Sequence, residues 1–284
     1  MRHLLKIITP PILWTAAKYI FRSFTSRSDS EEERYGWFGD YENWEDAMNE
    51  SVGYDNDPEI ISLVKKLTEN KRLDFNKNNK LIDNSNLRLI ACINHILNSE
   101  KSSEGSFHVL DFGGALGQHY FHLRNFLNLQ NISWNICETL PMVREGLLHF
   151  ESEELKFVES FNSLHTKFDL VLLSGVLQYV EKPLEILENI ISKKPKFILI
   201  DRFPMVPFFD EDRICIQNVN YGEDTSYPSR FFSEKWESSV FKQLDLLYEW
   251  HTGDGYTFED RSFNFKGYFF KLSSLSANKL PTAS

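Results

Sequence analysis

The chain has 284 residues, of which 42% are hydrophobic and 25% are charged, as in a globular protein with room for one α/β domain and an appended segment. Its formal net charge of −10 argues against nucleic-acid binding, because a grip on phosphate backbones depends on clustered Lys and Arg. The cysteines, Cys92, Cys137 and Cys215, lie far apart and form no C-x-x-C pair. We therefore expect neither a metal site nor a disulfide framework. The same cysteine usage is typical of a cytoplasmic protein.

Residues 1–28 carry the opposite charge from the whole, with five cations and no acid among apolar side chains. Lys6, Pro10, Pro11 and Lys18 interrupt the apolar run, which falls short of the ~20 residues of a membrane-spanning helix. Two interpretations stay open. The segment either lies on the inner face of a membrane, where each cation contributes about 1 kcal/mol near anionic lipid, or docks as a helix on the body of the protein.

Residues 29–104 are predicted to form a helical, aromatic-rich cap region. A polar linker leads into an aromatic block, YGWFGDYENW, at residues 35–44. Helices are expected at 45–51, 58–67 and 87–97, with an exposed loop at 71–86. The aromatic block is either a hydrophobic clasp or a lid over a ligand, because aromatic side chains bury large areas wherever they fall.

From residue 105 to residue 284 the pattern alternates between strands and helices, which predicts an α/β domain with a parallel sheet. Strands are expected at 107–111, 132–137, 155–158, from residue 168, and at 195–201. A helix is expected at 229–241. Two late strands, 244–250 and 263–272, are separated by a Gly-containing turn and predict a terminal antiparallel hairpin.

The stretch FHVLDFGGALG at 107–117 is predicted to be a buried strand, a tight glycine-rich turn and the start of a helix. A ligand can approach the backbone closely only where no Cβ intervenes. A dinucleotide fingerprint would place a second glycine where Ala115 stands, so that interpretation is disfavoured. The turn instead resembles the S-adenosylmethionine-binding motif of class I methyltransferases, and this resemblance implies a cofactor loop made of Asp111, Gly113, Gly114, Ala115 and Gly117.

Glu138 follows the second predicted strand, 27 residues beyond Asp111. One carboxylate at that position can accept hydrogen bonds from both ribose hydroxyls of an adenosyl group. The segment FDLVLLSGVLQYV, which begins at Phe168, resembles a second methyltransferase motif. It would bring Ser174, Gly175 and Gln178 to the carboxyl end of the sheet, where ligands bind in open α/β folds.

Transfer of a methyl group to an alcohol gains from a general base, and His or a carboxylate is the usual choice. His119 lies two residues past Gly117 and is our candidate catalytic residue; a helix-start residue that only caps or packs is the alternative. Tyr179 and Arg202 follow the fourth and fifth predicted strands and are candidates for substrate contact. No metal is expected.

Taken whole, the chain resembles a family of class I methyltransferases whose members are often found with bacterial surface-polysaccharide genes. The resemblance rests on the leading Pro-Pro pair, the G-x-Y-x-x-W-x-x-A block that begins at Gly39, the D-F-G-G-x-x-G turn, the acid after the second strand, the F-D-x-V strand and the R-x-P that begins at Arg202. It implies a Rossmann-like sheet with S-adenosylmethionine as cofactor. The acceptor it implies is a hydroxyl of a glycan or glycan precursor, either a small molecule or lipid-linked.

Two other functions stay open. The chain could keep the fold and work as a non-catalytic partner in a membrane-associated glycan assembly complex. A nicotinamide-dependent sugar oxidoreductase is disfavoured by Ala115 and by the late hairpin.

Overall fold

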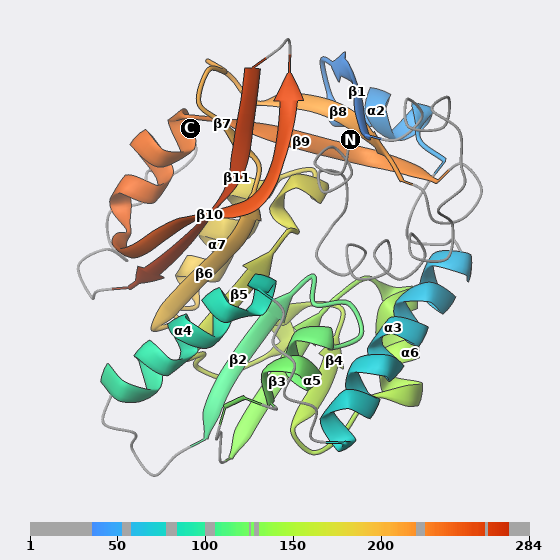
Figure 1. Ribbon diagram of the computed structural model, residues 1–284, viewed down its shortest axis with the longest axis vertical. Helices are drawn as coiled ribbons and strands as arrows, with labels where there is room; N and C mark the ends of the chain where they lie inside the picture. The colour runs from blue at the N-terminus through green and yellow to red at the C-terminus, as the bar shows by residue number, and fades with distance from the viewer. Residues whose placement is uncertain are drawn as a thin grey trace.

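The computed structural model describes residues 36–52, 58–77, 84–99, 106–124, 126–127, 131–219, 225–258 and 261–272. Its centre is a seven-stranded sheet in the order β10-β11-β6-β5-β2-β3-β4 (Figure 1). Strands β6, β5, β2, β3 and β4 run parallel to one another, whereas β11 is antiparallel to both β6 and β10. The strands are β2 (Phe107–Phe112), β3 (Ile132–Cys137), β4 (Leu155–Val158), β5 (Leu170–Ser174), β6 (Phe197–Phe203), β10 (Asp245–Phe258) and β11 (Arg261–Lys271).

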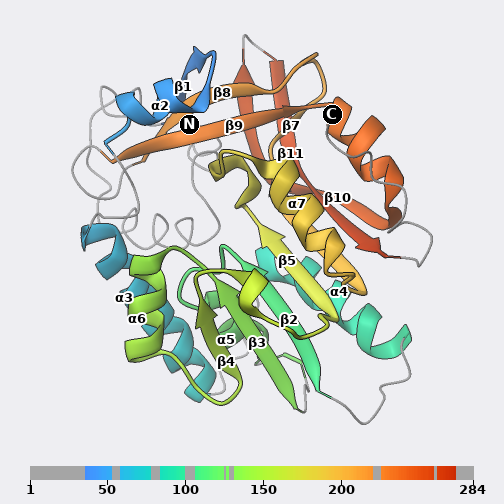
Figure 2. The same ribbon diagram turned by 180° about the vertical axis from the view of Figure 1, so that it is seen from behind.

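Helices cover both faces of this sheet. One face is packed under α3 (Pro58–Asn76), α4 (Asn84–Ser99) and α5 (Gln118–Arg124), which share a hydrophobic cluster with the strands (Figure 1). The opposite face is covered by α7 (Pro183–Ser192) together with the turns η5 (Trp236–Val240) and η6 (Phe241–Gln243) (Figure 2). A further helix, α6 (Leu140–His149), packs against β4, where Gly146 leaves room for the ring of Phe157.

A second sheet of four strands lies beyond the carboxyl ends of the parallel strands (Figures 1 and 2). Its order is β1-β8-β9-β7, and α2 (Trp44–Glu50) contacts its β8 and β9 strands. An aromatic cluster around Trp37 and Phe231 joins it to the far ends of β10 and β11. This sheet therefore combines a strand from the expected cap region, residues 29–104, with strands that follow it in the chain. They are β1 (Gly36–Tyr41) from the cap region, and β7 (Met205–Val206), β8 (Arg213–Asn218) and β9 (Ser226–Ser233).

The expected fold class is confirmed, because the sheet has a Rossmann-like parallel centre and ends in an antiparallel strand pair. The antiparallel pair at this edge is the one that the resemblance to class I methyltransferases implies. The aromatic block contributes strand β1 to the second sheet, so plain packing accounts for Trp37, whose indole nitrogen donates to Ser229 Oγ at 3.1 Å. Residues 1–28 lie outside the described residues.

Three local predictions are wrong. The helix expected at 229–241 is strand β9 up to Ser233 and a π-helical turn afterwards, because β9 is buried along nearly its whole length between β8 and β7. Helix α3 continues to Asn76 through part of the expected loop at 71–86. The turn expected at His251–Asp260 is largely strand, since β10 extends to Phe258.

Candidate functional site

The glycine-rich loop after β2 has the backbone geometry that its residues predict. Gly113 and Gly117 adopt φ values of 71° and 92°, which glycine reaches without steric cost. The N–H of Gly113 donates to the carbonyl of Cys137 at 2.9 Å, and the N–H of Gly117 donates to that of Gly114 at 3.0 Å. A Cβ on Gly114 would lie 2.5 Å from Cγ of Asp111, so the additional glycine is needed to let the loop cross the Asp111 carboxylate.

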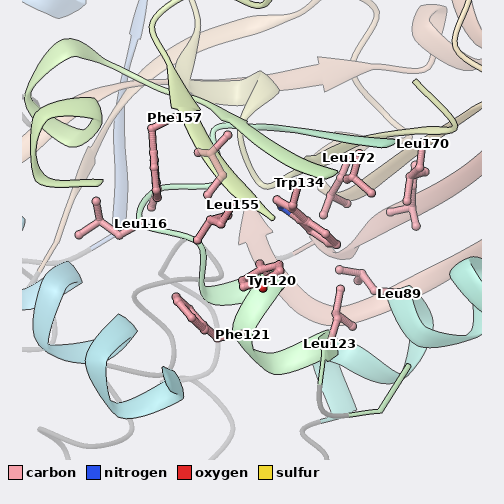
Figure 3. Close-up of a cluster of buried hydrophobic side chains, with 14 of the residues drawn as sticks. Leu89, Leu116, Tyr120, Phe121, Leu123, Trp134, Leu155, Phe157, Leu170 and Leu172 are labelled. Atoms are coloured by element: carbon pink, nitrogen blue, oxygen red, sulfur yellow. The ribbon is translucent and has the colours of Figure 1, made fainter. Parts of the chain in front are cut away.

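Asp111 is almost fully buried, with 1% exposure, at the end of β2. Its Oδ2 accepts a hydrogen bond from the indole Nε1 of Trp134 at 3.1 Å and lies 3.3 Å from Nδ1 of His119. Trp134 is itself fully buried in the hydrophobic cluster beneath the loop (Figure 3). Asp111 thus supports the loop from below and orients the His119 ring.

Glu138 closes β3 and turns toward the same loop. Its Oε1 accepts from the backbone N–H of Ala115 at 3.0 Å, and its Oε2 accepts from the N–H of Thr139 at 2.8 Å. Both carboxylate oxygens thus face backbone N–H groups, one in the glycine-rich loop and one just after β3. Ala115 adopts φ 49°, a left-handed conformation that points its N–H at Glu138 although the residue is not glycine.

The loop after β5 lies directly against the glycine-rich loop, since a side chain on Gly113 would collide with Val176. Gly175 adopts φ 63°, and its N–H donates to the carbonyl of Asp201 at 2.8 Å. Ser174 and Gln178 are 5% and 3% exposed, respectively. The predicted residues of this segment and of the glycine-rich loop therefore meet at one end of the sheet, as the parallel β2–β5 pairing requires.

Tyr179 joins this end of the main sheet to the second sheet. Its hydroxyl donates to Oε1 of Gln217 on β8 at 2.7 Å, and its ring stands edge-on to that of Tyr227 on β9 at 5.2 Å. Burial is the main cause that raises the pKa of Tyr179, and the nearby Arg202 guanidinium opposes that rise. Tyr179 and Arg202, the two candidates for substrate contact, thus share one electrostatic environment.

Arg202 is 4% exposed at the end of β6 and has φ 58°, a conformation that costs a non-glycine residue about 1–2 kcal/mol. Its Nη1 pairs with Oδ2 of Asp254 at 3.2 Å. Asp254 reaches this position because β10 carries two more residues than β11 between the pairs His251–Lys266 and Gly255–Asn264. Such bulges often occur near functional sites, where they re-aim a side chain.

Asp201 precedes Arg202 and is 2% exposed on the opposite side of the strand. It accepts a hydrogen bond from the indole of Trp250 at 2.8 Å and lies 3.5 Å from Nε of Arg88 on α4. Burial raises the pKa of this carboxyl above its ordinary value, against the opposing effect of Arg88. The end of β6 therefore holds a charged network whose partners come from α4 and β10.

Two buried polar atoms beside the loop have no hydrogen-bond partner among the described residues. They are Nε2 of Gln118, whose residue is 6% exposed, and Oγ1 of Thr139, next to Glu138. A buried donor without an acceptor costs about 1–3 kcal/mol, so such groups call for a partner. A glycine-rich loop, a carboxylate bonded to it and two unpartnered polar atoms in neighbouring residues fit an adenosyl amino acid such as S-adenosylmethionine.

Sequence patterns alone missed Gln118, Trp134, Gln217 and Asp254. Gln118 could have been noticed because it directly follows the last glycine of the loop, whereas the other three act only through contacts between distant segments. The described part of the chain contains no group of three or more His, Cys, Asp or Glu side chains that could hold a metal ion. The three cysteines are free and buried, and burial raises the pKa of Cys137 to about 11. Among the helices in the described ranges, none has the length and apolar character needed to cross a bilayer.

Several solved structures resemble the chain. An S-adenosylmethionine-dependent methyltransferase from Clostridium acetobutylicum is 15% identical, with a TM-score of 0.44, over 68% of this chain and 93% of that one. The 1,6-didemethyltoxoflavin-N1-methyltransferase of Burkholderia thailandensis is 13% identical, with a TM-score of 0.41, over 78% and 93%. The magnesium protoporphyrin IX methyltransferase of Synechocystis is 11% identical, with a TM-score of 0.42, over 66% and 84%.

No protein-family model matches the chain. No curated protein matches it either. Because the identities and TM-scores of these solved structures are low, the fold class is assigned from the strand order of this chain and from the antiparallel position of β11.

Proposed function

We propose that this protein is an S-adenosylmethionine-dependent methyltransferase that acts on a hydroxyl of a glycan or glycan precursor. The observation that carries the proposal is the position of Glu138, which ends the strand next to the glycine-rich loop and bonds to the loop at Ala115. An acid in that place can bind both hydroxyls of a ribose while the loop backbone approaches the rest of the ligand.

The cofactor residues in this proposal occupy two adjoining loops. The first is the glycine-rich loop with its supporting acid, and the second follows β5. Glu138 would hold the ribose, and the orphaned hydroxyl of Thr139 lies beside it as a further partner. The complete set is Asp111, Gly113, Gly114, Ala115, Gly117, Glu138, Ser174, Gly175 and Gln178.

S-adenosylmethionine, when bound, supplies a sulfonium methyl group that an oxygen can displace in line. The protein then has to orient the acceptor and remove a proton, and holding two reactants in place can lower the barrier by about 7–11 kcal/mol. We assign the proton removal to Nε2 of His119. Asp111 lies 3.3 Å from Nδ1 of that ring, and a carboxylate there fixes the tautomer in which Nε2 is the acceptor.

The acceptor would lie at the ends of β5 and β6, under the second sheet. Tyr179 and Arg202 are the residues we assign to it, and the link from Tyr179 to Gln217 makes the second sheet one wall of this region. The glycan part of the proposal comes from the family resemblance. The proposed cytoplasmic location comes from the cysteine usage, and the proposed peripheral membrane contact comes from the cations and apolar side chains of residues 1–28. Such a contact would suit a lipid-linked acceptor.

The nicotinamide-dependent oxidoreductase receives no support from the fold, since an antiparallel β11 between β6 and β10 is not expected of a dinucleotide-binding sheet. A non-catalytic partner is not favoured either. A buried amide donor without an acceptor beside the loop suits a protein that binds a ligand there, and transfer of label into glycan in the experiment below would exclude a purely non-catalytic role.

Isothermal titration calorimetry with S-adenosylmethionine, S-adenosylhomocysteine and NAD(P) tests the cofactor. We expect heat from the first two and none from the third; no binding of either sulfur ligand would refute the proposal. Incubation with S-adenosylmethionine carrying a labelled methyl group and a cell-envelope extract tests the acceptor. We expect label in glycan, whereas label only in protein or nucleic acid would refute the glycan part.

A further inference from the structure

We propose that the side-chain amide of Gln118 binds the α-carboxylate of the amino-acid part of S-adenosylmethionine. Gln118 is the first residue of α5 and directly follows Gly117, the last glycine of the loop. The inference rests on the proposed function, since it names a new contact within the same cofactor site.

The side-chain amide of Gln118 has an unsatisfied donor. Nε2 of Gln118 is buried without a hydrogen-bond partner among the described residues, and the residue is 94% buried. Most buried donors in folded proteins are paired, so an unpaired one beside a ligand loop needs a specific explanation. An N–H donor requires an acceptor, and a carboxylate is an acceptor-only group that makes strong hydrogen bonds of this kind.

The position of Glu138 determines the direction in which we expect the ligand to lie. Glu138 contacts the loop at Ala115, three residues before Gln118, and its negative charge repels a carboxylate while it accepts from hydroxyls. An adenosyl amino acid has its ribose hydroxyls near one end and its carboxylate at the other. With the ribose at Glu138, the carboxylate has to lie away from that residue. Gln118, at the start of α5 and three residues beyond Ala115, offers the carboxylate an unpaired donor.

Gln118 differs in its contacts from Asp111 and His119, its neighbours in the site. Their polar atoms already meet, with Oδ2 of Asp111 at 3.3 Å from Nδ1 of His119 and accepting from Trp134. These contacts hold the loop and the imidazole whether or not a ligand is present. Gln118 makes no such supporting contact through Nε2, so its role would begin only when the cofactor binds.

The test compares two ligands that differ only at the amino-acid end. S-adenosylhomocysteine has the carboxylate, whereas 5′-methylthioadenosine keeps the adenosine and the sulfur without it. For Gln118→Met we expect the Kd of S-adenosylhomocysteine to rise roughly 10- to 100-fold, the effect of losing a hydrogen bond to a charged group. The Kd of 5′-methylthioadenosine should stay within about twofold, because a removed donor matters only to a ligand that reaches it.

Thermal unfolding of the free proteins gives a second readout. Gln118→Met replaces an unpaired buried donor by an apolar group of similar size, so its Tm should equal or exceed that of the parent. The matched control is Asn135→Leu, a buried amide whose Nδ2 donates to the carbonyl of Val109 at 3.3 Å. This control should lower the Tm and leave the ratio of the two Kd values unchanged.

Gln118→Glu provides an independent variant, because a second carboxylate at this position should weaken S-adenosylhomocysteine more than Gln118→Met does. The inference is overturned if both Gln118 variants keep the parent ratio of the two Kd values, or if both ligands weaken equally. Failure of the unaltered protein to bind either ligand would instead overturn the proposed function, so the two failures are distinguishable.

Discussion

Just past β3, the acidic side chain of Glu138 is held by backbone groups, whereas at the end of β6 charged side chains are held by side chains from remote elements. Glu138 bonds to the backbone N–H groups of Ala115 and Thr139. Arg202 instead pairs with Asp254, 52 positions further along the chain, which reaches it from a bulge in the terminal hairpin.

This difference teaches how the two halves of the site can vary. Backbone donors are present whatever the side chains are, so the cofactor half can tolerate replacements such as alanine for glycine at position 115. The other half depends on pairs of particular side chains from β6, β8 and β10, and a change in either partner alters it. Substrate preference is therefore expected to reside in the second sheet and the hairpin bulge.

The largest expected effect would break the comparison at Glu138. In Glu138→Ala the ribose loses its acceptor and the N–H of Ala115 loses its partner, so the Kd of S-adenosylhomocysteine should rise roughly 100-fold or more. Calorimetry measures it, with circular dichroism to show that the fold is kept. The control Glu154→Ala removes an acid that lies outside the loop and pairs with Arg124 at a distance of 3.0 Å. This variant should bind S-adenosylhomocysteine normally. Normal binding by Glu138→Ala would contradict the role given to this residue.

The next effect concerns the buried pair at the end of β6. Asp254→Ala removes the carboxylate that Arg202 contacts at 3.2 Å, where the two side chains are 4% and 12% exposed. Breaking a buried pair on one side costs about 3 kcal/mol or more in the free energy of unfolding.

Urea denaturation of the variant measures that cost. Calorimetry should show that the Kd of S-adenosylhomocysteine stays within about twofold, because Asp254 pairs with Arg202 in the acceptor half of the site and not with the cofactor loops. The exposed pair Lys182–Glu185 supplies the control, since Glu185→Ala should change the stability by less than about 1 kcal/mol. A large loss of cofactor affinity in Asp254→Ala would show that the two halves of the site are not separate.

The same contrast explains how much of the molecule could be predicted from the sequence. The fold follows from periodic patterns within short segments, such as the apolar run that ends at Asp111, and from the late hairpin. The ends of neighbouring parallel strands meet at one edge of the sheet, so Asp111, Glu138 and Ser174 could be brought together without coordinates.

The remaining features depend on contacts that no local pattern encodes. Strand β9 is buried on both sides, so it lacks the alternation that marks a half-exposed strand, and the pattern from residue 229 onward wrongly predicts a helix. The pairing of Arg202 with Asp254 depends on the bulge in β10, and the bond from Trp134 to Asp111 crosses between neighbouring strands. At these three positions, contacts between segments that are separated in the sequence determine the structure.

A smaller effect would sharpen the distinction between a supporting acid and a ligand-binding one. Asp111→Ala leaves the buried Nε1 of Trp134 without its acceptor, which should lower the free energy of unfolding by about 2 kcal/mol. Asp111→Asn keeps an oxygen for the indole and should lose less. Chemical denaturation measures both. If Asp111→Ala were as stable as the parent protein, the carboxylate would not be supporting the loop, and a direct role toward the ligand would become the better explanation.

The smallest effect is expected at Ala115, where two opposing terms meet. Ala115→Gly relieves a left-handed φ of 49°, worth about 1–2 kcal/mol, but it removes a buried methyl group and adds freedom to the unfolded chain. The net change in stability should stay within about 1 kcal/mol, because these contributions are similar in size. The backbone N–H that donates to Glu138 is kept, so calorimetry should find little change in the affinity for S-adenosylhomocysteine.

Ala115→Val is the contrasting variant. A β-branched residue is strained at this φ, so the substitution should destabilise the protein and lower its affinity for the cofactor. Equal behaviour of the glycine and valine variants would mean that the backbone of the loop does not set the position of Glu138.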